Sequence, residues 1–146
     1  MIVEARGDLA RGGAQGLVNP VNTVGVMGKG LALQFKRAHP EVFAAYATAC
    51  AEGRVRAGRV LPVALPHGRW VLHFPTKRHW RDASRIEDVR DGLDDLVRVV
   101  GELELSSLAV PALGCGLGGL PWPDVRALVT EKLGPLRAEV RLYGSR

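Results

Sequence analysis

Short apolar runs alternate with segments of helical periodicity along this chain, and this alternation constrains the fold more than any other feature. We expect six strands, over Ile2–Ala5, Gln15–Val18, Val60–Leu65, Trp70–Phe74, Leu108–Ala112 and Glu139–Tyr143. Helices are expected over 31–38, 42–49, 84–100 and 123–133, with a break at Pro40 and a capping box formed by Ser84 and Glu87. Strands that alternate with helices imply an α/β fold with a largely parallel sheet covered on both faces.

The composition is that of one compact domain. The chain has 146 residues, of which 47% are hydrophobic and 24% charged, so we expect a single domain over residues 1–146. Its two cysteines, Cys50 and Cys115, form no disulfide or metal pattern. No uncharged apolar stretch reaches the roughly 18 residues that a membrane span needs, and the N-terminal residues MIVEARGD are charged. These features predict a cytoplasmic protein that is neither exported nor bound to a membrane.

A glycine-rich segment, GVMGKGLALQFK, follows the second expected strand. Gly25, Gly28 and Gly30 precede a helical pattern, so backbone N–H groups can approach a phosphate while the helix dipole favours its charge. The segment is not a Walker A loop, because no glycine stands five positions before Gly28 and Gly30 replaces the Ser or Thr that would hold magnesium. Nucleotide hydrolysis of the P-loop kind is therefore not expected.

A second glycine-rich segment, from Gly114 to Gly119, follows the apolar strand LAVPAL and matches GxGxxG. A Rossmann fingerprint belongs to the first βα unit of a longer domain, whereas this segment lies near the end of the chain. Either glycine segment alone is equally consistent with a tight turn. Two of them in one small α/β domain favour a ligand that carries two phosphates.

Positive charge gathers in the segment FPTKRHWRDASR. The formal net charge of the chain is +5, which by itself favours a polyanionic partner only weakly. The basic and aromatic members of the segment are Lys77, Arg78, His79, Trp80, Arg81 and Arg85. A basic run that contains an aromatic residue is typical of segments that hold a nucleic-acid strand through phosphates and base stacking. Two alternatives stay open, in which the run is ordinary solvated surface or Trp80 belongs to the core.

The order of these motifs resembles a macrodomain, the module that binds ADP-ribose. Gly7-Asp8 follows the first strand, Asn19-Pro20-Val21-Asn22 follows the second, and GCGLGGLPW follows the fifth. The stretches MGKGLALQFK and FPTKRHWRDAS are more specific, and they are similar to the macrodomains of DarG antitoxins, which remove ADP-ribose from thymidine in DNA. The resemblance implies a three-layer α/β/α fold with a mixed, largely parallel six-stranded sheet.

The resemblance also implies a set of ligand contacts. Asp8 would accept a hydrogen bond from the adenine amine, Asn22 would face the distal ribose, and Tyr143 would stack on adenine. The two glycine segments would enclose the phosphates and ribose through Gly28, Lys29, Gly30, Gly114, Cys115, Gly116, Leu117 and Gly118. Taken from the residue types alone, Asp8 also fits a turn or helix cap, Tyr143 fits ordinary packing, and Cys115 fits a small loop residue.

Lys77 is the candidate catalytic residue. Hydrolysis of the bond between ribose and a thymine nitrogen passes through an oxocarbenium-like state, and a cation beside the departing base stabilises its negative charge. A lysine amine that attacks the sugar and a lysine that only contacts phosphate are the alternatives. The related terminal ADP-ribose glycohydrolase pairs its lysine with an aspartate at a position where this sequence has Gly118. That pair is therefore not carried over, which favours electrostatic catalysis by Lys77.

Together with the resemblance, these motifs predict an ADP-ribosyl glycohydrolase that removes ADP-ribose from thymidine bases in DNA and so reverses a DNA-modifying toxin. The expected partners are ADP-ribose, ADP-ribosylated single-stranded DNA and a cognate DNA ADP-ribosyltransferase toxin, and the chain itself is expected to be a monomer. No cofactor or metal is expected, because His39, His67 and His73 are scattered. The alternatives are a non-catalytic ADP-ribose reader, a hydrolase of ADP-ribosylated protein carboxylates, and a plain nucleic-acid-binding domain.

Overall fold

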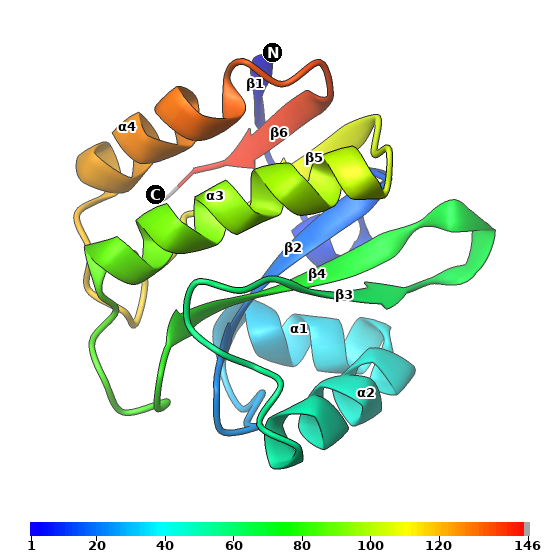
Figure 1. The fold of residues 1–146 in the computed structure, drawn as a ribbon, viewed down its shortest axis with the longest axis vertical. Helices are drawn as coiled ribbons and strands as arrows, with labels where there is room; N and C mark the ends of the chain where they lie inside the picture. The colour runs from blue at the N-terminus through cyan, green and yellow to red at the C-terminus, as the bar shows by residue number, and fades with distance from the viewer. Residues whose placement is uncertain (145–146) are drawn as a thin grey trace.

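The computed structural model describes residues 1–144, which form a six-stranded sheet with four α-helices (Figure 1). The strands are β1 (Ile2–Ala5), β2 (Gly16–Asn22), β3 (Leu61–Ala64), β4 (Trp70–Lys77), β5 (Ser107–Val110) and β6 (Glu139–Tyr143). The helices are α1 (Gly30–Ala38), α2 (Pro40–Ala51), α3 (Ile86–Glu102) and α4 (Trp122–Leu133), with short 3-10 turns η1 (Leu9–Arg11) and η2 (Pro66–Gly68). Each expected strand and helix is present, with some ends shifted. Within residues 1–144, no helix is long and apolar enough to cross a membrane.

The strands lie in the order β1-β6-β5-β2-β4-β3. The first five of these are parallel to one another, and β3 pairs antiparallel with β4 at the edge. The expected mixed, largely parallel sheet is confirmed. Because the parallel strands end at one edge of the sheet, the loops that follow β1, β2, β4 and β5 gather there.

The sheet separates two apolar clusters, because successive residues of a strand face opposite sides. In β2, Leu17 packs with Phe35 and Val42 of α1 and α2. Its neighbour Val18 belongs to the opposite cluster with Leu96 of α3 and the buried face of α4. In Figure 1, α3 and α4 lie together in the upper part of the view, and α1 and α2 lie below β3 and β4. The three-layer α/β/α arrangement is therefore confirmed.

Two strands extend further than the sequence predicts. β2 continues to Asn22, because the stretch 19–22 pairs with β4 in parallel register, with Pro20 opposite Phe74. β5 pairs with β2 only at Gly16 and Leu17, so Pro20 lies where β2 has one neighbour, and its missing N–H breaks no ladder. β4 likewise continues past Phe74 to Lys77, which lies opposite Asn22.

The predicted capping box of Ser84 and Glu87 is wrong. α3 begins at Ile86 with Arg85 at its N-cap, and no side chain caps it. Ser84 is 7% exposed, and its backbone N–H donates to the carbonyl of Gly118 at 2.9 Å. Ser84, which the local pattern assigns to the N-terminal cap of α3, therefore pairs with a distant loop instead.

His73 and Asn19 form a polar pair in the core. Both are fully buried, and Asn19 Nδ2 donates to His73 Nδ1 over 3.3 Å. The ring of neutral His73 therefore carries its proton on Nε2. Burial lowers the pKa of His73 from 6.5 to about 4, so the side chain is neutral at pH 7.

Protonation of His73 should destabilise the fold in acid. Because its folded pKa lies below the usual value, its contribution should be complete above pH 6.5 and fall as the pH drops through about 4. The whole loss corresponds to about 3 kcal/mol of unfolding free energy. Urea unfolding at pH 7 and pH 4.5 measures it. His73→Gln should flatten this pH dependence and exposed His67→Asn should keep it, whereas equal slopes for all three proteins would contradict the assignment.

Candidate functional site

Three loops meet at the carboxyl ends of β5, β2 and β4, which are neighbours in the sheet. They are the three segments that the sequence analysis selected. We name them the first glycine loop (23–30), the basic loop (77–85) and the second glycine loop (114–119). Ligands of open α/β sheets bind at this position, outside the carboxyl ends of the strands.

Backbone contacts join the basic loop to both glycine loops. At one end, Thr23 donates its N–H and its hydroxyl to the carbonyl of Arg78, at 3.3 and 2.6 Å. At the other end, the N–H of Ser84 donates to the carbonyl of Gly118 at 2.9 Å. The three loops are therefore held as one unit.

Asn22 organises the first glycine loop. Its side-chain oxygen accepts hydrogen bonds from the N–H groups of Val24, Gly25 and Val26 at 3.1–3.3 Å. Its Nδ2 donates to the carbonyl of Val26 at 2.8 Å. The side-chain oxygen of Asn22 is thus occupied within the loop. The predicted contact of Asn22 with the distal ribose stays a prediction, and the second hydrogen of Nδ2 is the group that could make it.

Tyr46 supports Asn22 from α2, and the sequence analysis did not identify it. Its buried hydroxyl lies 2.8 Å from both the backbone carbonyl and the side-chain oxygen of Asn22. Burial raises the pKa of Tyr46, and Cys50 beside it adds to the shift, so the hydroxyl stays a donor. A tyrosine on the apolar side of a helix has the pattern of a core residue, so its contact with Asn22 is visible only in the structure.

The first glycine loop leads into an open helix N-terminus. Gly25 and Gly30 have φ values of +97° and +58°, a region that favours glycine. α1 begins after Lys29 at its N-cap, and no side chain caps its first N–H groups. Such a terminus attracts an anion. Gly28, Lys29 and Gly30 are all exposed, which agrees with their predicted place against phosphate or ribose.

The second glycine loop has an exposed tip and a buried base. Gly116 and Leu117 are exposed, and a Cβ on Gly116 would meet nothing within 4 Å. Gly114 and Gly118 are buried. Cys115 is half-buried, its thiol donates to a loop carbonyl at 3.6 Å, and burial raises its pKa. The thiol is therefore protonated at pH 7, as befits a small loop residue and not a nucleophile.

Gly118 is a packing position. A Cβ at this residue would overlap Ser84 Oγ and the carbonyl oxygen of Gly114. Within residues 1–144, Ser84 Oγ is buried without a hydrogen-bond partner. Any side chain at position 118 would push the second glycine loop away from the basic loop. A contact of Gly118 with diphosphate can therefore come only from its backbone.

Lys77 is the last residue of β4 and stands opposite Asn22 in the strand register. Its side chain is half-exposed, and Nζ donates to the carbonyl of Trp80 at 3.3 Å. The predicted catalytic residue thus lies beside the residue that the resemblance assigns to the distal ribose. This places its ammonium group at the edge of the candidate site.

Two residues of the basic loop are engaged within the fold. Arg78 pairs with Asp88 of α3 at 3.4 Å, so its charge is partly neutralised. His79 Nδ1 accepts the N–H of Arg81 at 3.1 Å, which shapes the turn. Arg85 is exposed at the N-cap of α3. Within residues 1–144, Arg85 and Arg81 are both exposed, and neither forms an ion pair with a carboxylate.

Trp80 is 43% exposed, so the alternative that it belongs to the core is wrong. The guanidinium of Arg81 lies 4.5 Å from the centroid of its ring, and the ring of His79 lies 5.2 Å away. An exposed aromatic ring with a cation beside it is the arrangement on which an unpaired base can stack. A nucleic-acid contact of this loop stays a prediction, and its solvated-surface alternative stays open.

Asp8 and Tyr143 lie at the other end of the site. β1 and β6 pair with Ala5 opposite Tyr143, and Asp8 follows in the loop after β1. Asp8 forms an exposed ion pair with Arg11 at 3.3 Å, and Tyr143 packs half-buried against the cluster beneath η1. From β6 to β4 the sheet spans three strand spacings, about 14 Å. The predicted adenine contacts and Lys77 would therefore hold opposite ends of an elongated ligand.

Within residues 1–144, no group of three or more His, Cys, Asp or Glu side chains is placed to hold a metal ion. Two of the three scattered histidines have other partners. His39 Nε2 lies 3.0 Å from the carbonyl of Ala10, and His73 is paired with Asn19.

Three linked loops on a mixed α/β/α sheet define a class of protein, the macrodomains. The model of the Macro domain family matches residues 18–129, and the chain belongs to this family.

Particular relatives narrow the class. The chain is 50% identical, over 98% of its length, to the DNA ADP-ribosyl glycohydrolase of Thermus aquaticus. The macrodomain of Mycobacterium tuberculosis DarG matches 100% of this chain, with 99% of its own chain covered, a TM-score of 0.97 and 44% identity. Thermosipho africanus DarTG in complex with ADP-ribose matches 97% of this chain, with 41% of its own covered, a TM-score of 0.92 and 38% identity. The resemblance to DarG macrodomains is confirmed. The chain spans 41% and 36% of the length of the first curated relatives that it matches.

Alanine at position 118 should separate the second glycine loop from the basic loop, whereas position 116 has free space. We expect Gly118→Ala to cost about 1–3 kcal/mol of unfolding free energy, as overpacking does. Gly116→Ala serves as the matched control and should leave the free energy nearly unchanged. Urea denaturation of both variants measures the difference. Equal stability of the two would show that the buried base of the loop tolerates a side chain.

Proposed function

We propose that this chain is an ADP-ribosyl glycohydrolase that removes ADP-ribose from thymidine bases in DNA and thereby reverses the action of a DNA-modifying toxin. The observation that carries the proposal is the place of Lys77, which ends β4 opposite Asn22 in a basic, aromatic loop bonded to both glycine loops. A module that only bound ADP-ribose would have no use for this arrangement. Two relatives, 50% and 51% identical, bear the name DNA ADP-ribosyl glycohydrolase, which supports the same activity.

In the proposed complex, ADP-ribose lies across the carboxyl ends of the strands. Adenine occupies the end near Asp8 and Tyr143, and the diphosphate lies between the exposed tip of the second glycine loop and the N-terminus of α1. The free N–H groups there donate to the phosphates. The distal ribose then lies beside Lys77. The similar Thermosipho africanus DarTG structure was solved in complex with ADP-ribose, which supports a ligand of this kind.

The proposed reaction is hydrolysis of the bond between the distal ribose C1 and a thymine nitrogen. As this bond lengthens, positive charge develops on the ribose and negative charge on the thymine. Water adds its hydroxyl to C1, and its proton ends on the thymine. The departing base spreads its charge over two carbonyls, and the ammonium of Lys77 stabilises that charge where it develops.

The packing at Gly118 favours an electrostatic over a covalent role for Lys77. In the terminal ADP-ribose glycohydrolase pattern, an aspartate at this position accompanies the lysine. Here a Cβ at 118 would overlap Ser84 Oγ and the carbonyl of Gly114, so a carboxylate has no room. We therefore assign Lys77 the role of a fixed cation.

The proposal includes single-stranded DNA and a toxin as partners. Exposed Trp80, with Arg81 over its ring, would stack on an unpaired base next to the modified thymidine. A Thermosipho africanus relative is named a DNA ADP-ribosyl transferase-DNA ADP-ribosyl glycohydrolase fusion protein. By analogy, we propose a DNA ADP-ribosyltransferase as the functional partner of this chain, which we treat as one macrodomain over residues 1–146.

Two substrates tested side by side decide the reaction class. We expect release of ADP-ribose from an oligonucleotide modified on thymidine and none from a protein modified on carboxylates, with chromatography of free ADP-ribose as the measurement. Release of ADP-ribose from the modified protein alone would show that the chain is a hydrolase of ADP-ribosylated protein carboxylates. Tight binding of ADP-ribose without release from either substrate would make it a reader.

Lys77→Ala should lower the turnover of modified DNA by about 10²–10³-fold, the usual cost of deleting one preorganised electrostatic group. The affinity for ADP-ribose, measured by calorimetry, should barely change. Lys132→Ala, a lysine of α4, is the control and should keep the parent rate.

The arginine variant separates the two roles of this residue. Lys77→Arg keeps the charge without the amine, so partial activity supports electrostatic stabilisation. Complete loss of activity with an intact fold, or borohydride trapping of a lysine–ribose adduct, would show amine attack instead. If Lys77→Ala turned over at the parent rate, Lys77 would have no part in the reaction.

A further inference from the structure

A groove lined by arginines lies outside the candidate site, between the segment 52–60 and α3. The charged residues of its lining are Glu52, Arg54, Arg56, Arg59, Asp95 and Arg98. The groove has a volume of about 350 Å³. Four guanidinium groups face two carboxylates in it, so its charge is positive.

Two buried valines anchor the segment 52–60 to the core, and its arginines remain exposed. Val55 and Val60 are 5% and 6% exposed and belong to the apolar clusters. The N–H of Val60 also donates to the carboxylate of Asp95 at 2.7 Å. Arg54 and Arg56 flank Val55 in the sequence and are exposed. The backbone is thus fixed while the arginine side chains stay accessible to a ligand.

The ion pairs within the groove neutralise only part of its positive charge. Arg54 pairs with Glu52 at 3.3 Å, and both side chains are exposed. Arg59 and Arg98 share one carboxylate, that of Asp95, at 4.0 and 2.8 Å. Arg98 also pairs with Glu102 at 2.8 Å, so we do not count it among the ligand contacts. Within residues 1–144, Arg56 pairs with no carboxylate and donates to a backbone carbonyl at 3.1 Å. Exposed ion pairs contribute little to stability, so the arginines of the segment can exchange a carboxylate for a phosphate.

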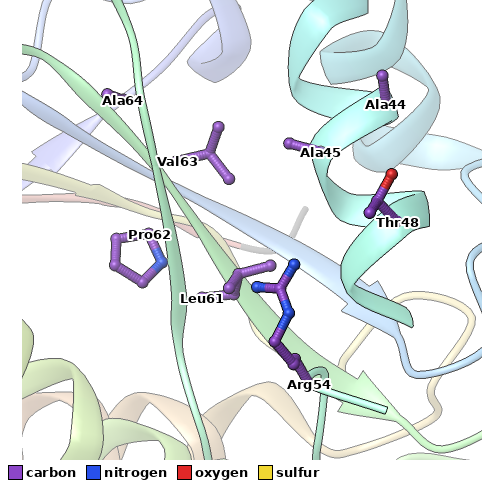
Figure 2. Close-up of a pocket in the computed structure, with 8 residues that line it drawn as sticks. All are labelled: Ala44, Ala45, Thr48, Arg54, Leu61, Pro62, Val63 and Ala64. Atoms are coloured by element: carbon purple, nitrogen blue, oxygen red, sulfur yellow. The ribbon is translucent and has the colours of Figure 1, made fainter. Parts of the chain in front are cut away.

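An apolar groove continues from Arg54 between α2 and β3. Figure 2 shows Arg54 near Thr48 and Leu61, and Ala45 of α2 across from Val63 of β3. This second groove has a volume of about 520 Å³, and Arg54 lines both grooves. Small side chains on α2 leave an apolar wall against which an unpaired base can lie.

The arginine groove lies at the same end of the sheet as the candidate site. β3 is antiparallel to β4, so the segment before β3 lies where β4 ends, with Leu61 opposite His73. From His73 to Lys77 the strand rises by about 13 Å. Val55 also shares a buried cluster with Met27 of the first glycine loop. A nucleic-acid strand held at Lys77 would therefore need to extend only a few nucleotides toward β3 to reach the groove.

We propose that this groove binds the phosphates of the single-stranded DNA that flanks the modified thymidine, through Arg54, Arg56 and Arg59. The inference rests on the proposed function and extends the recognised substrate from one nucleotide to a stretch of strand. A nucleic-acid strand fits better than an acidic protein segment, because the arginine groove lies at the same end of the sheet as the basic loop and the apolar groove beside it accepts an unpaired base. A duplex offers no such base.

Two triple variants with equal loss of charge test the proposal. The groove variant carries R54Q, R56Q and R59Q, and the control variant carries R126Q, K132Q and R137Q, on α4 and after it. Turnover is measured on a modified thymidine dinucleotide and on a modified 12-mer. The groove variant should lose about tenfold in kcat/KM on the 12-mer and far less on the dinucleotide, which is too short to reach the groove. Equal losses of both variants on the 12-mer would overturn the proposal, since they would reflect net charge alone.

Binding of unmodified oligo-dT, twelve nucleotides long, makes the test independent of catalysis. In fluorescence anisotropy, the dependence of log Kd on log salt should weaken by about 2 in the groove variant, from about 0.7 for each lost phosphate contact. The control variant should keep the parent slope. Identical slopes for all three proteins, or binding of poly-glutamate through the groove in preference to oligo-dT, would overturn the proposal. A groove effect on oligo-dT without any turnover by the parent protein would refute the proposed reaction and leave the groove assignment intact.

Discussion

Two backbone contacts position the rest of the site. Thr23 donates to the carbonyl of Arg78, and Ser84 donates to the carbonyl of Gly118, so both ends of the basic loop are attached to the glycine loops. A single hydrogen bond of this kind contributes only about 1 kcal/mol net, but it fixes direction. The loop that begins with Lys77 is therefore held in place before a substrate arrives, and in the proposed reaction a preorganised charge would need no rearrangement.

Space limits the chemistry that this arrangement can perform. Close packing of Gly118 on Ser84 and Gly114 brings the second glycine loop against the basic loop and removes the room for a carboxylate. The tip of the same loop at Gly116 stays open, so one short segment combines a closely packed base with an exposed tip. Asn22 likewise has two structural roles. Its side-chain amide shapes the first glycine loop, and its backbone pairs with β4, the strand that ends in Lys77.

Local patterns in the sequence predicted the strands, the helices and the glycine loops correctly, because each of these depends on the spacing of nearby residues. Ser84 shows the limit of such patterns: Ser-x-x-Glu favours a helix cap, but the N–H of Ser84 pairs with Gly118, far along the chain. The contact of Tyr46 with Asn22 and that of Asp95 with the arginine segment are likewise tertiary. The sequence left Trp80 between surface and core, and only the path of the basic loop places it outside.

The most direct measurement is a crystal structure of Lys77→Ala with an oligonucleotide that carries ADP-ribose on thymidine. We expect the diphosphate between the two glycine loops, the thymine stacked near Trp80, and the ribose–thymine bond facing the space that the Lys77 side chain leaves. A distal ribose that points away from residue 77, with the modified base on another face of the domain, would contradict the assignment of Lys77 to the reaction.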